Sequence, residues 1–375
     1  MAMEEDIVLH VGAPKCGSSS LQATLSEAPD FQSRSNHPYS YVALTPQGRL
    51  LRSEKLTSSA HRTVFGYAAS PDIAPDDTPA WLSQGADPIR QLVEEGITPI
   101  LSAEGWINRA KRFREAEFLT GAKLTAHVIV FIRPPMEWLN SAWWQWGAWS
   151  NTTVERFVRA NVEAARWNML VTSWLRLPGV KKVTVRLADS DSVKGFFDIL
   201  DVEPPVQKRT NSGIPASLRY FMTRNREFRA SPHEPATEFA AARQLNWTEP
   251  TPWVIDTPLA GFVIRHLTQA NKNLLDKFSA EDRAKVEQDP RWWDLDLYSA
   301  RALANPADFS TSQALRDLAT AMHTRLEAQR RALPADVTDR LSQWSDSMAI
   351  ADADAILTTL LREILALDES QRQKT

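Results

Sequence analysis

A lysine and several small hydroxyl residues follow a short apolar run near the start of the sequence. Residues 7–11 are apolar apart from one histidine, and an amphipathic stretch covers residues 18–28. This order predicts a strand, a glycine-bearing turn and a helix. Such a turn directs backbone N–H groups and the positive end of the helix at one point, which suits a phosphate. We therefore predict a phosphate-binding set made of Gly12, Pro14, Lys15, Cys16, Gly17, Ser18 and Ser19.

The position of the lysine separates this turn from a Walker A loop. A Walker A loop has its lysine directly before a serine or threonine. Here Lys15 lies two places before Gly17, and Ser18 stands where the Walker lysine would be. An ordinary ATPase with this sequence would lose its lysine contact to the β- and γ-phosphates.

A second anion-binding pair follows the most apolar run of the chain. Residues 126–132 read as a central parallel strand, Arg133 ends it, and Ser141 lies eight residues further on. Ligands of α/β proteins bind at the carboxyl ends of parallel strands, and an arginine fork can hold two phosphate oxygens. Two anion sites on one sheet edge match a nucleotide phosphorylated at both its 5′ and 3′ positions.

The glycine turn and the pair of Arg133 and Ser141 both resemble motifs of a known enzyme family. Residues 12–22, Gly-Ala-Pro-Lys-Cys-Gly-Ser-Ser-Ser-Leu-Gln, resemble the motif PKxGTTxLQ of bacterial sulfotransferases that use 3′-phosphoadenosine-5′-phosphosulfate (PAPS). Serines stand at positions 18 and 19, where threonine is commoner. The Arg133 and Ser141 pair resembles the 3′-phosphate site of the same family. The resemblance covers roughly residues 7–200, and Arg209 lies in a segment that resembles one closing over the nucleotide.

The resemblance implies a fold, a reaction and a co-substrate. The fold is a P-loop-like α/β sheet, the co-substrate is PAPS, the product is 3′-phosphoadenosine-5′-phosphate (PAP), and no metal is needed. Lys15 would stabilise the leaving nucleotide, and a general base would take the proton of an acceptor hydroxyl. Glu104 follows a predicted strand on the same sheet edge and resembles the Ser-x-Glu segment of glycan-acting members. His10 is the alternative base, although a histidine in a strand is more often packed and hydrogen-bonded.

The rest of the chain predicts how these residues are positioned. Strands are predicted at residues 7–11, 97–101, 126–132 and 183–187, with helices between them, which favours a parallel sheet covered on both faces. Residues 30–85 show little period and are interpreted as long loops with at most one helix. Beyond residue 213 the signals are helical, at 214–229, 258–278, 311–331 and 348–367. We place an α/β domain at 1–298 and a helical extension at 299–375.

Two apolar patterns have competing explanations. The C-terminal helices carry apolar stripes at three- and four-residue steps, and packing onto the chain's own core is favoured over a homodimer. The helix after Arg133 carries five tryptophans, which we expect to be mostly core, with one or two facing a cleft. They are Trp138, Trp143, Trp144, Trp146 and Trp149.

Composition limits the class of protein. The 375 residues have a formal net charge of −3, which argues against nucleic acid as a partner. The single cysteine fits a reducing compartment, and neither a signal peptide nor a membrane span is recognisable, so a cytoplasmic enzyme is expected. The predicted acceptor is a hydroxyl compound, with a glycan or glycolipid favoured. A P-loop-type small-molecule or sugar kinase and a non-catalytic nucleotide-binding scaffold are the alternatives.

Overall fold

The computed structural model describes residues 5–73, 80–188, 191–205, 213–247 and 249–374. The chain divides into two compact units. The first comprises residues 1–139, 160–209 and 257–299, and the second comprises residues 140–159, 210–256 and 300–375. Each unit therefore contains segments that are far apart in the sequence.

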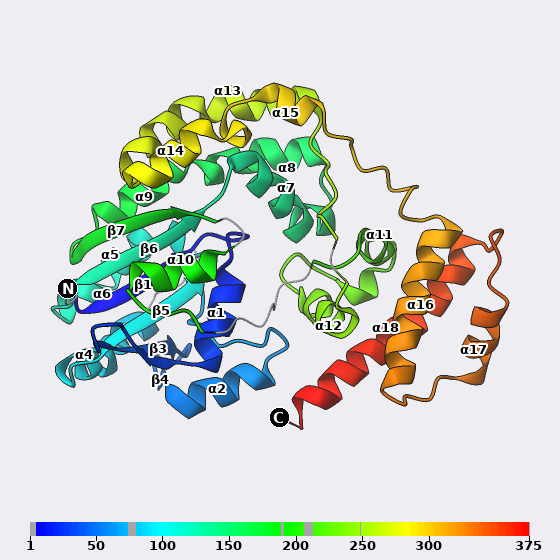
Figure 1. Ribbon diagram of the computed structural model, residues 1–375, viewed down its shortest axis with the longest axis horizontal. Helices are drawn as coiled ribbons and strands as arrows, with labels where there is room; N and C mark the ends of the chain where they lie inside the picture. Colours follow the sequence, from blue (N-terminus) through cyan, green and yellow to red (C-terminus); the bar gives the residue numbers. More distant parts are fainter. Residues whose placement is uncertain (1–4, 74–79, 189–190, 206–212, 248, 375) are drawn as a thin grey trace. The chain divides into compact units, whose positions relative to one another are not determined.

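The first unit is built on a mixed sheet of mostly parallel strands. The strands lie in the order β2-β3-β5-β1-β6-β7, with β4 paired to the outer side of β3 (Figure 1). Every pairing among β3, β5, β1, β6 and β7 is parallel, whereas β2 and β4 run antiparallel to β3. The bounds are β1 Ile7–Gly12, β2 Asp30–Gln32, β3 Pro38–Leu44, β4 Leu50–Leu51, β5 Thr98–Glu104, β6 Ala126–Ile132 and β7 Val180–Leu187.

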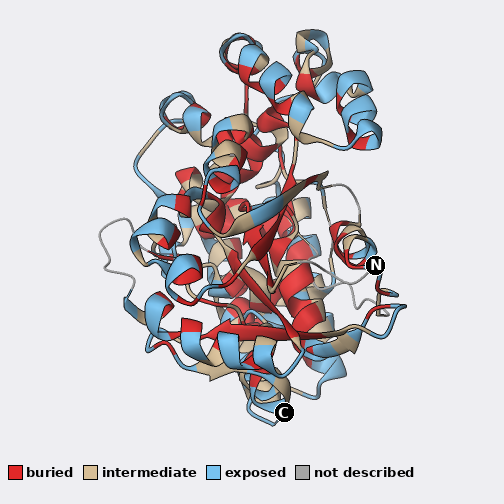
Figure 2. Cartoon of the chain, turned by 90° about the vertical axis from the view of Figure 1, so that its left-hand side faces the viewer, coloured by how far each residue is buried: buried red, intermediate tan, exposed pale blue. Residues whose placement is uncertain are grey.

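The inner strands are buried because their side chains are apolar on both faces. Every residue of β1 and β6 is buried, as the continuous apolar runs predict for strands covered on both sides (Figure 2). Helices flank the sheet: α1 contacts α2 and α10, while α5, α6 and α9 form another connected group. The helices of this unit are α1 Ser18–Glu27, α2 Ser53–Arg62, α3 Ala80–Gln84, α4 Ala86–Glu94, α5 Ala110–Glu115, α6 Phe118–Gly121, α9 Trp167–Leu175, α10 Ser192–Ile199, α13 Thr257–Leu274, α14 Ala280–Gln288 and α15 Leu295–Ser299.

The predicted α/β class is confirmed, and the four predicted strands are present with small changes in their bounds. The interpretation of residues 30–85 as loops was wrong, because β2, β3 and β4 lie there. β3 begins at a proline and alternates tyrosine and serine before it turns aliphatic, so it lacks the apolar run of β6. Its burial comes from pairing with β5 on one side and β2 on the other.

The described residues of the second unit form helices joined by loops, with no strand among them. Its helices are α8 Val154–Asn161, α11 Ala216–Arg224, α12 Ala236–Leu245, α16 Ser312–Ala328, α17 Ala335–Ser342 and α18 Ile350–Arg372, and α7 Pro135–Gln145 runs into it from the first unit. The apolar stripes of α16 and α18 lie in one buried cluster with α11 and α12, so the predicted packing onto the chain's own core is confirmed. The structure thus groups the predicted extension at 299–375 with two earlier segments.

Candidate functional site

The turn between β1 and α1 has the backbone geometry of an anion site. Gly17 caps the helix with φ of 91°, and Lys15 also has a positive φ of 62°. A β-carbon at Gly17 would lie 2.8 Å from Ser192 Oγ, so the close approach of α10 also requires glycine there. The first N–H groups of a helix lack partners within the helix. The turn therefore holds donors and a lysine at the carboxyl end of a central strand.

A second cation lies against this turn. Arg133 follows β6, and its Nη1 donates a hydrogen bond to the carbonyl oxygen of Lys15 at 3.2 Å. The start of α7 is tied to the same turn, because Trp138 Nε1 donates to the carbonyl oxygen of Pro14 at 2.9 Å. Arg133 is itself held by Trp167, whose Nε1 donates to its carbonyl oxygen at 3.0 Å. The structure thus places Arg133 in direct contact with the turn of Lys15, whereas the sequence predicted two separate anion sites on one sheet edge.

Glu104 lies directly beside the turn. The parallel register pairs Gly12 with Glu104, and the N–H of Gly105 donates to the carbonyl oxygen of Gly12 at 2.8 Å. The side chain is partly exposed. Burial raises the pKa of the Glu104 carboxyl, the positive charge of Lys15 opposes this, and the negative charge of Asp72 adds to it. A carboxylate with a raised pKa is a better proton acceptor than an ordinary surface glutamate.

The side chains of the small residues in the turn differ in burial and in hydrogen bonding. Burial raises the pKa of the Cys16 thiol to about 12, so this side chain stays protonated and contributes to the turn through its backbone. Ser18 is buried and donates to the carbonyl oxygen of Ala13 at 3.4 Å. Ser19 is partly exposed, and its Oγ lies 3.5 Å from the hydroxyl of Tyr67. Ser19 is therefore the hydroxyl of the pair that faces the outside of the turn.

Sequence reasoning missed two residues of this site. Tyr67 and Asp72 lie in residues 63–73, within the stretch interpreted as loops, and no periodicity or spacing marks them. Asp72 forms a bidentate pair with Arg109 at 3.1 and 2.8 Å. Its carboxylate lies 3.0 Å from where a β-carbon of Gly105 would be. Only the topology, which brings this segment across the end of β5, could have revealed them.

His10 lies inside the molecule rather than in the turn. Its Nδ1 is 2.7 Å from Ser102 Oγ, which also accepts a hydrogen bond from Gln22 Nε2 at 3.0 Å. Its ring lies 6.0 Å, centre to centre, from the rings of both Phe131 and Phe196. Burial lowers the pKa of His10 to about 3, so the ring is neutral at pH 7. These contacts join β1, β5 and α1. They lie two residues before Gly12 on β1 and two residues before Glu104 on β5.

Ser141, Arg209 and the tryptophans after Arg133 are the remaining residues singled out from the sequence. Ser141 is buried on α7 in the second unit, and Arg209 lies outside the described residues. Among the five tryptophans after Arg133, three are buried, as expected for core, and two are partly exposed. The buried ones are Trp138, Trp144 and Trp149, and the partly exposed ones are Trp143 and Trp146.

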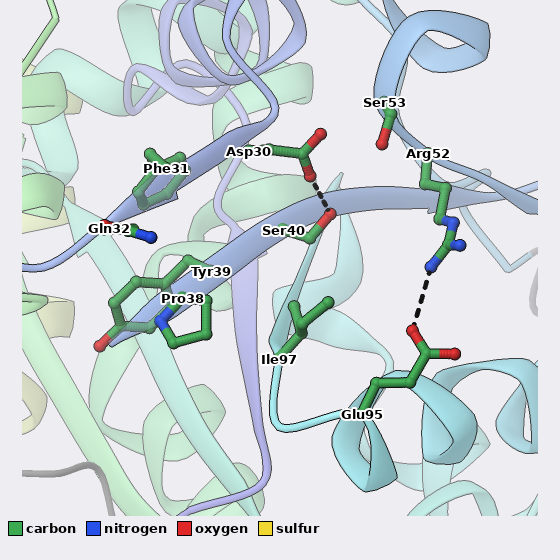
Figure 3. Close-up of a pocket in the computed structure, with 10 residues that line it drawn as sticks. All are labelled: Asp30, Phe31, Gln32, Pro38, Tyr39, Ser40, Arg52, Ser53, Glu95 and Ile97. Atoms are coloured by element: carbon green, nitrogen blue, oxygen red, sulfur yellow. Dashed lines mark hydrogen bonds and ion pairs between the residues drawn. The ribbon is translucent and has the colours of Figure 1, made fainter. Parts of the chain in front are cut away.

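A hollow at the opposite end of the strands is separate from this site. It lies over β2 and β3 and is lined by residues that include Tyr39, Arg52 and Glu95 (Figure 3). Tyr39 pairs with Thr98, the first residue of β5, whereas Glu104 is its last. The hollow therefore contains none of the predicted site residues.

Within the described ranges, no three histidine, cysteine, aspartate or glutamate side chains are grouped so that they could hold a metal ion. In the same ranges, no helix has the length and apolar character needed to cross a membrane. No family model, curated protein or solved structure matches the chain.

Proposed function

We propose that the protein is a PAPS-dependent sulfotransferase with a P-loop-like nucleotide site. The observation that carries the proposal is the meeting of three groups at one sheet edge. Arg133 is hydrogen-bonded to the turn that carries Lys15, and Glu104 pairs in register with the glycine that opens this turn. Two cations beside a carboxylate of raised pKa suit an anionic donor and a hydroxyl acceptor.

The residues of the turn fit a phosphosulfate. Gly12 is in close contact with its surroundings, because a β-carbon there would lie 2.5 Å from Ser18 Oγ. Glycine at position 12 therefore lets the start of α1 pack closely against the end of β1, and the N–H groups at this helix start are the donors from which a phosphate would accept hydrogen bonds. The lysine precedes the second glycine, which leaves the place of the Walker lysine to a serine that is bonded within the turn. This arrangement favours a 5′-phosphosulfate over the triphosphate of a kinase substrate.

Each residue of the site then has a role in the reaction. PAPS supplies the sulfuryl group, whose bond to the bridging phosphate oxygen breaks as a bond to the acceptor oxygen forms. Glu104 takes the proton of the acceptor hydroxyl, and Lys15 stabilises the negative charge that develops on the departing nucleotide. Arg133 holds the 3′-phosphate through its guanidinium fork. We propose a saccharide hydroxyl as the acceptor and the cytoplasm as the location.

Binding of the product nucleotide tests the proposal. We expect PAP to bind the wild-type protein, measured by calorimetry, and ATP to bind much more weakly. Arg133→Ala should weaken PAP at least about 30-fold, because a buried phosphate would lose its charged partner. Arg90→Ala is the matched control, since Arg90 pairs with Asp87 and Glu94 on an exposed helix. Tighter binding of ATP, with no effect of Arg133→Ala, would favour the kinase and contradict the proposal.

A further inference from the structure

Tyr67 is carried by a segment that is fixed to the sheet at several points. The Tyr41 hydroxyl donates to the carbonyl oxygen of Ala68 at 2.6 Å, and the N–H of Ser70 donates to the carbonyl oxygen of Ser102 at 3.2 Å. Further along, Trp106 Nε1 donates to the carbonyl oxygen of Pro71 at 2.9 Å, next to the Asp72 and Arg109 pair. Because the residues that follow Tyr67 are anchored in this way, the segment holds the phenol next to Ser19 of the turn.

The phenol of Tyr67 lies next to the turn of the proposed site. Its oxygen is 3.5 Å from Ser19 Oγ, at the limit of a hydrogen bond, so this contact is weak. Burial raises the pKa of Tyr67 to about 12, and the negative charge of Glu104 contributes to the rise. The phenol therefore remains protonated at neutral pH, as a neutral hydrogen-bond donor within the electric field of the proposed base.

The position of Tyr67 has a consequence if the proposed function is correct. A group transferred from a phosphate in the turn to a hydroxyl beside Glu104 must lie between the turn and that carboxylate. Tyr67 contacts Ser19 of the turn, and the segment that follows it runs beside the end of β5 that carries Glu104, with Ser70 bonded to Ser102 and Asp72 packed against Gly105. We propose that Tyr67 binds the sulfuryl group, its hydroxyl donating a hydrogen bond to a sulfuryl oxygen in place of Ser19. This inference rests on the proposed function and adds a donor that the sequence motifs do not contain.

The difference between two nucleotides tests the role of Tyr67 without an acceptor. PAPS carries the sulfuryl group and PAP does not, so calorimetry with both isolates contacts to that group. Tyr67→Phe should weaken PAPS about tenfold, the effect of one hydrogen bond to a charged group, and leave PAP within about twofold. Tyr41→Phe is the matched control: it removes a hydroxyl that anchors the same segment, and it should weaken both nucleotides to the same extent or neither.

The outcomes distinguish the inference from the proposed function. If wild-type protein binds neither PAP nor PAPS, the proposed function is wrong. If it binds them, two results would show that Tyr67 does not bind the sulfuryl group. Tyr67→Phe could change the affinities for PAP and PAPS by the same factor, or it could leave both unchanged. A selective loss of PAPS in Tyr41→Phe as large as that in Tyr67→Phe would assign the effect to the anchoring of the segment and would also overturn the inference. Thermal unfolding of both variants will establish that they are folded.

Discussion

At the scale of single residues, Glu104 is set between charges of opposite sign. Lys15 on one side favours the carboxylate, and Asp72 on the other disfavours it. Asp72 is held by Arg109 and packs against the backbone of Gly105, so it cannot easily move away. The proton affinity of the proposed base is therefore set by burial and by the charges of these two neighbours.

The acid side of the pH profile should report this balance. The rate of PAP release from PAPS should fall as the pH is lowered through the raised pKa of Glu104, because the protonated acid cannot accept a proton. Asp72→Asn removes a negative charge that raises this pKa, so the fall should move to lower pH. Glu104→Gln should reduce turnover about 100-fold or more and abolish this pH dependence.

An exposed aspartate provides the control for this experiment. Asp87 lies on α4, with 79% of its side chain exposed, and Asp87→Asn should leave the profile unchanged. A profile that is the same in wild type and Glu104→Gln would show that Glu104 is not the base. A shift to higher pH in Asp72→Asn would contradict the electrostatic argument.

At the scale of elements, three buried side chains fix the register beneath the site. Ser102 on β5 accepts a hydrogen bond from Gln22 on α1 and shares a second one with Nδ1 of the neutral His10 ring on β1. Since Gly12 and Glu104 lie two residues further along the same strands, these contacts hold them in line. His10 therefore supports the site by holding β1 in register with β5.

Removing the central hydroxyl should be costly. Ser102→Ala leaves buried polar atoms of both Gln22 and His10 without their partner, and should lower the free energy of unfolding by about 3 kcal/mol. Ser40→Ala is the matched control on β3, because Ser40 is buried but donates to the exposed Asp30, which water can solvate. That change should cost less than about 1 kcal/mol. Urea denaturation measures both, and equal losses would show that the buried network adds no stability.

The sequence was most informative where local pattern and burial agree. The apolar runs of β1 and β6 and the glycine turn after β1 predicted those elements, and they put Lys15 and Arg133 at the carboxyl ends of their strands. The same reasoning failed for β3, since a strand of tyrosine and serine is buried only because of its neighbours. It also missed Tyr67 and Asp72, which reach the site through a long connection rather than through periodicity.

At the scale of the whole molecule, the second unit is closed by contacts between distant segments. Asp368 on α18 has only 1% of its side chain exposed and accepts hydrogen bonds from Arg243 and Gln244 on α12. Arg372, one turn further along α18, completes the set. These hydrogen bonds lower the pKa of Asp368 against the effect of burial, so its charge is a structural part of this unit.

Neutralising this carboxylate should destabilise the second unit. Asp368→Asn keeps the shape but leaves two arginines without their counter-charge, and we expect a loss of about 3 kcal/mol. Native-state hydrogen exchange of the α12 and α18 peptides measures it. Glu227→Gln is the control, because Glu227 forms an exposed pair with Arg362 in the same unit and should cost less than about 1 kcal/mol. Similar protection in both variants would contradict this account.

The division of the second unit among three stretches of chain has a consequence for its synthesis. The segment 210–256 leaves the ribosome roughly 100 residues before α18 does, a delay on the order of ten seconds at ordinary translation rates. During that delay the apolar sides of α11 and α12 lack the helices that cover them in the finished protein. The first unit, in contrast, has all of its segments once residue 299 has been made. The nascent chain therefore passes through a stage in which one unit can fold while the other still depends on protection from aggregation.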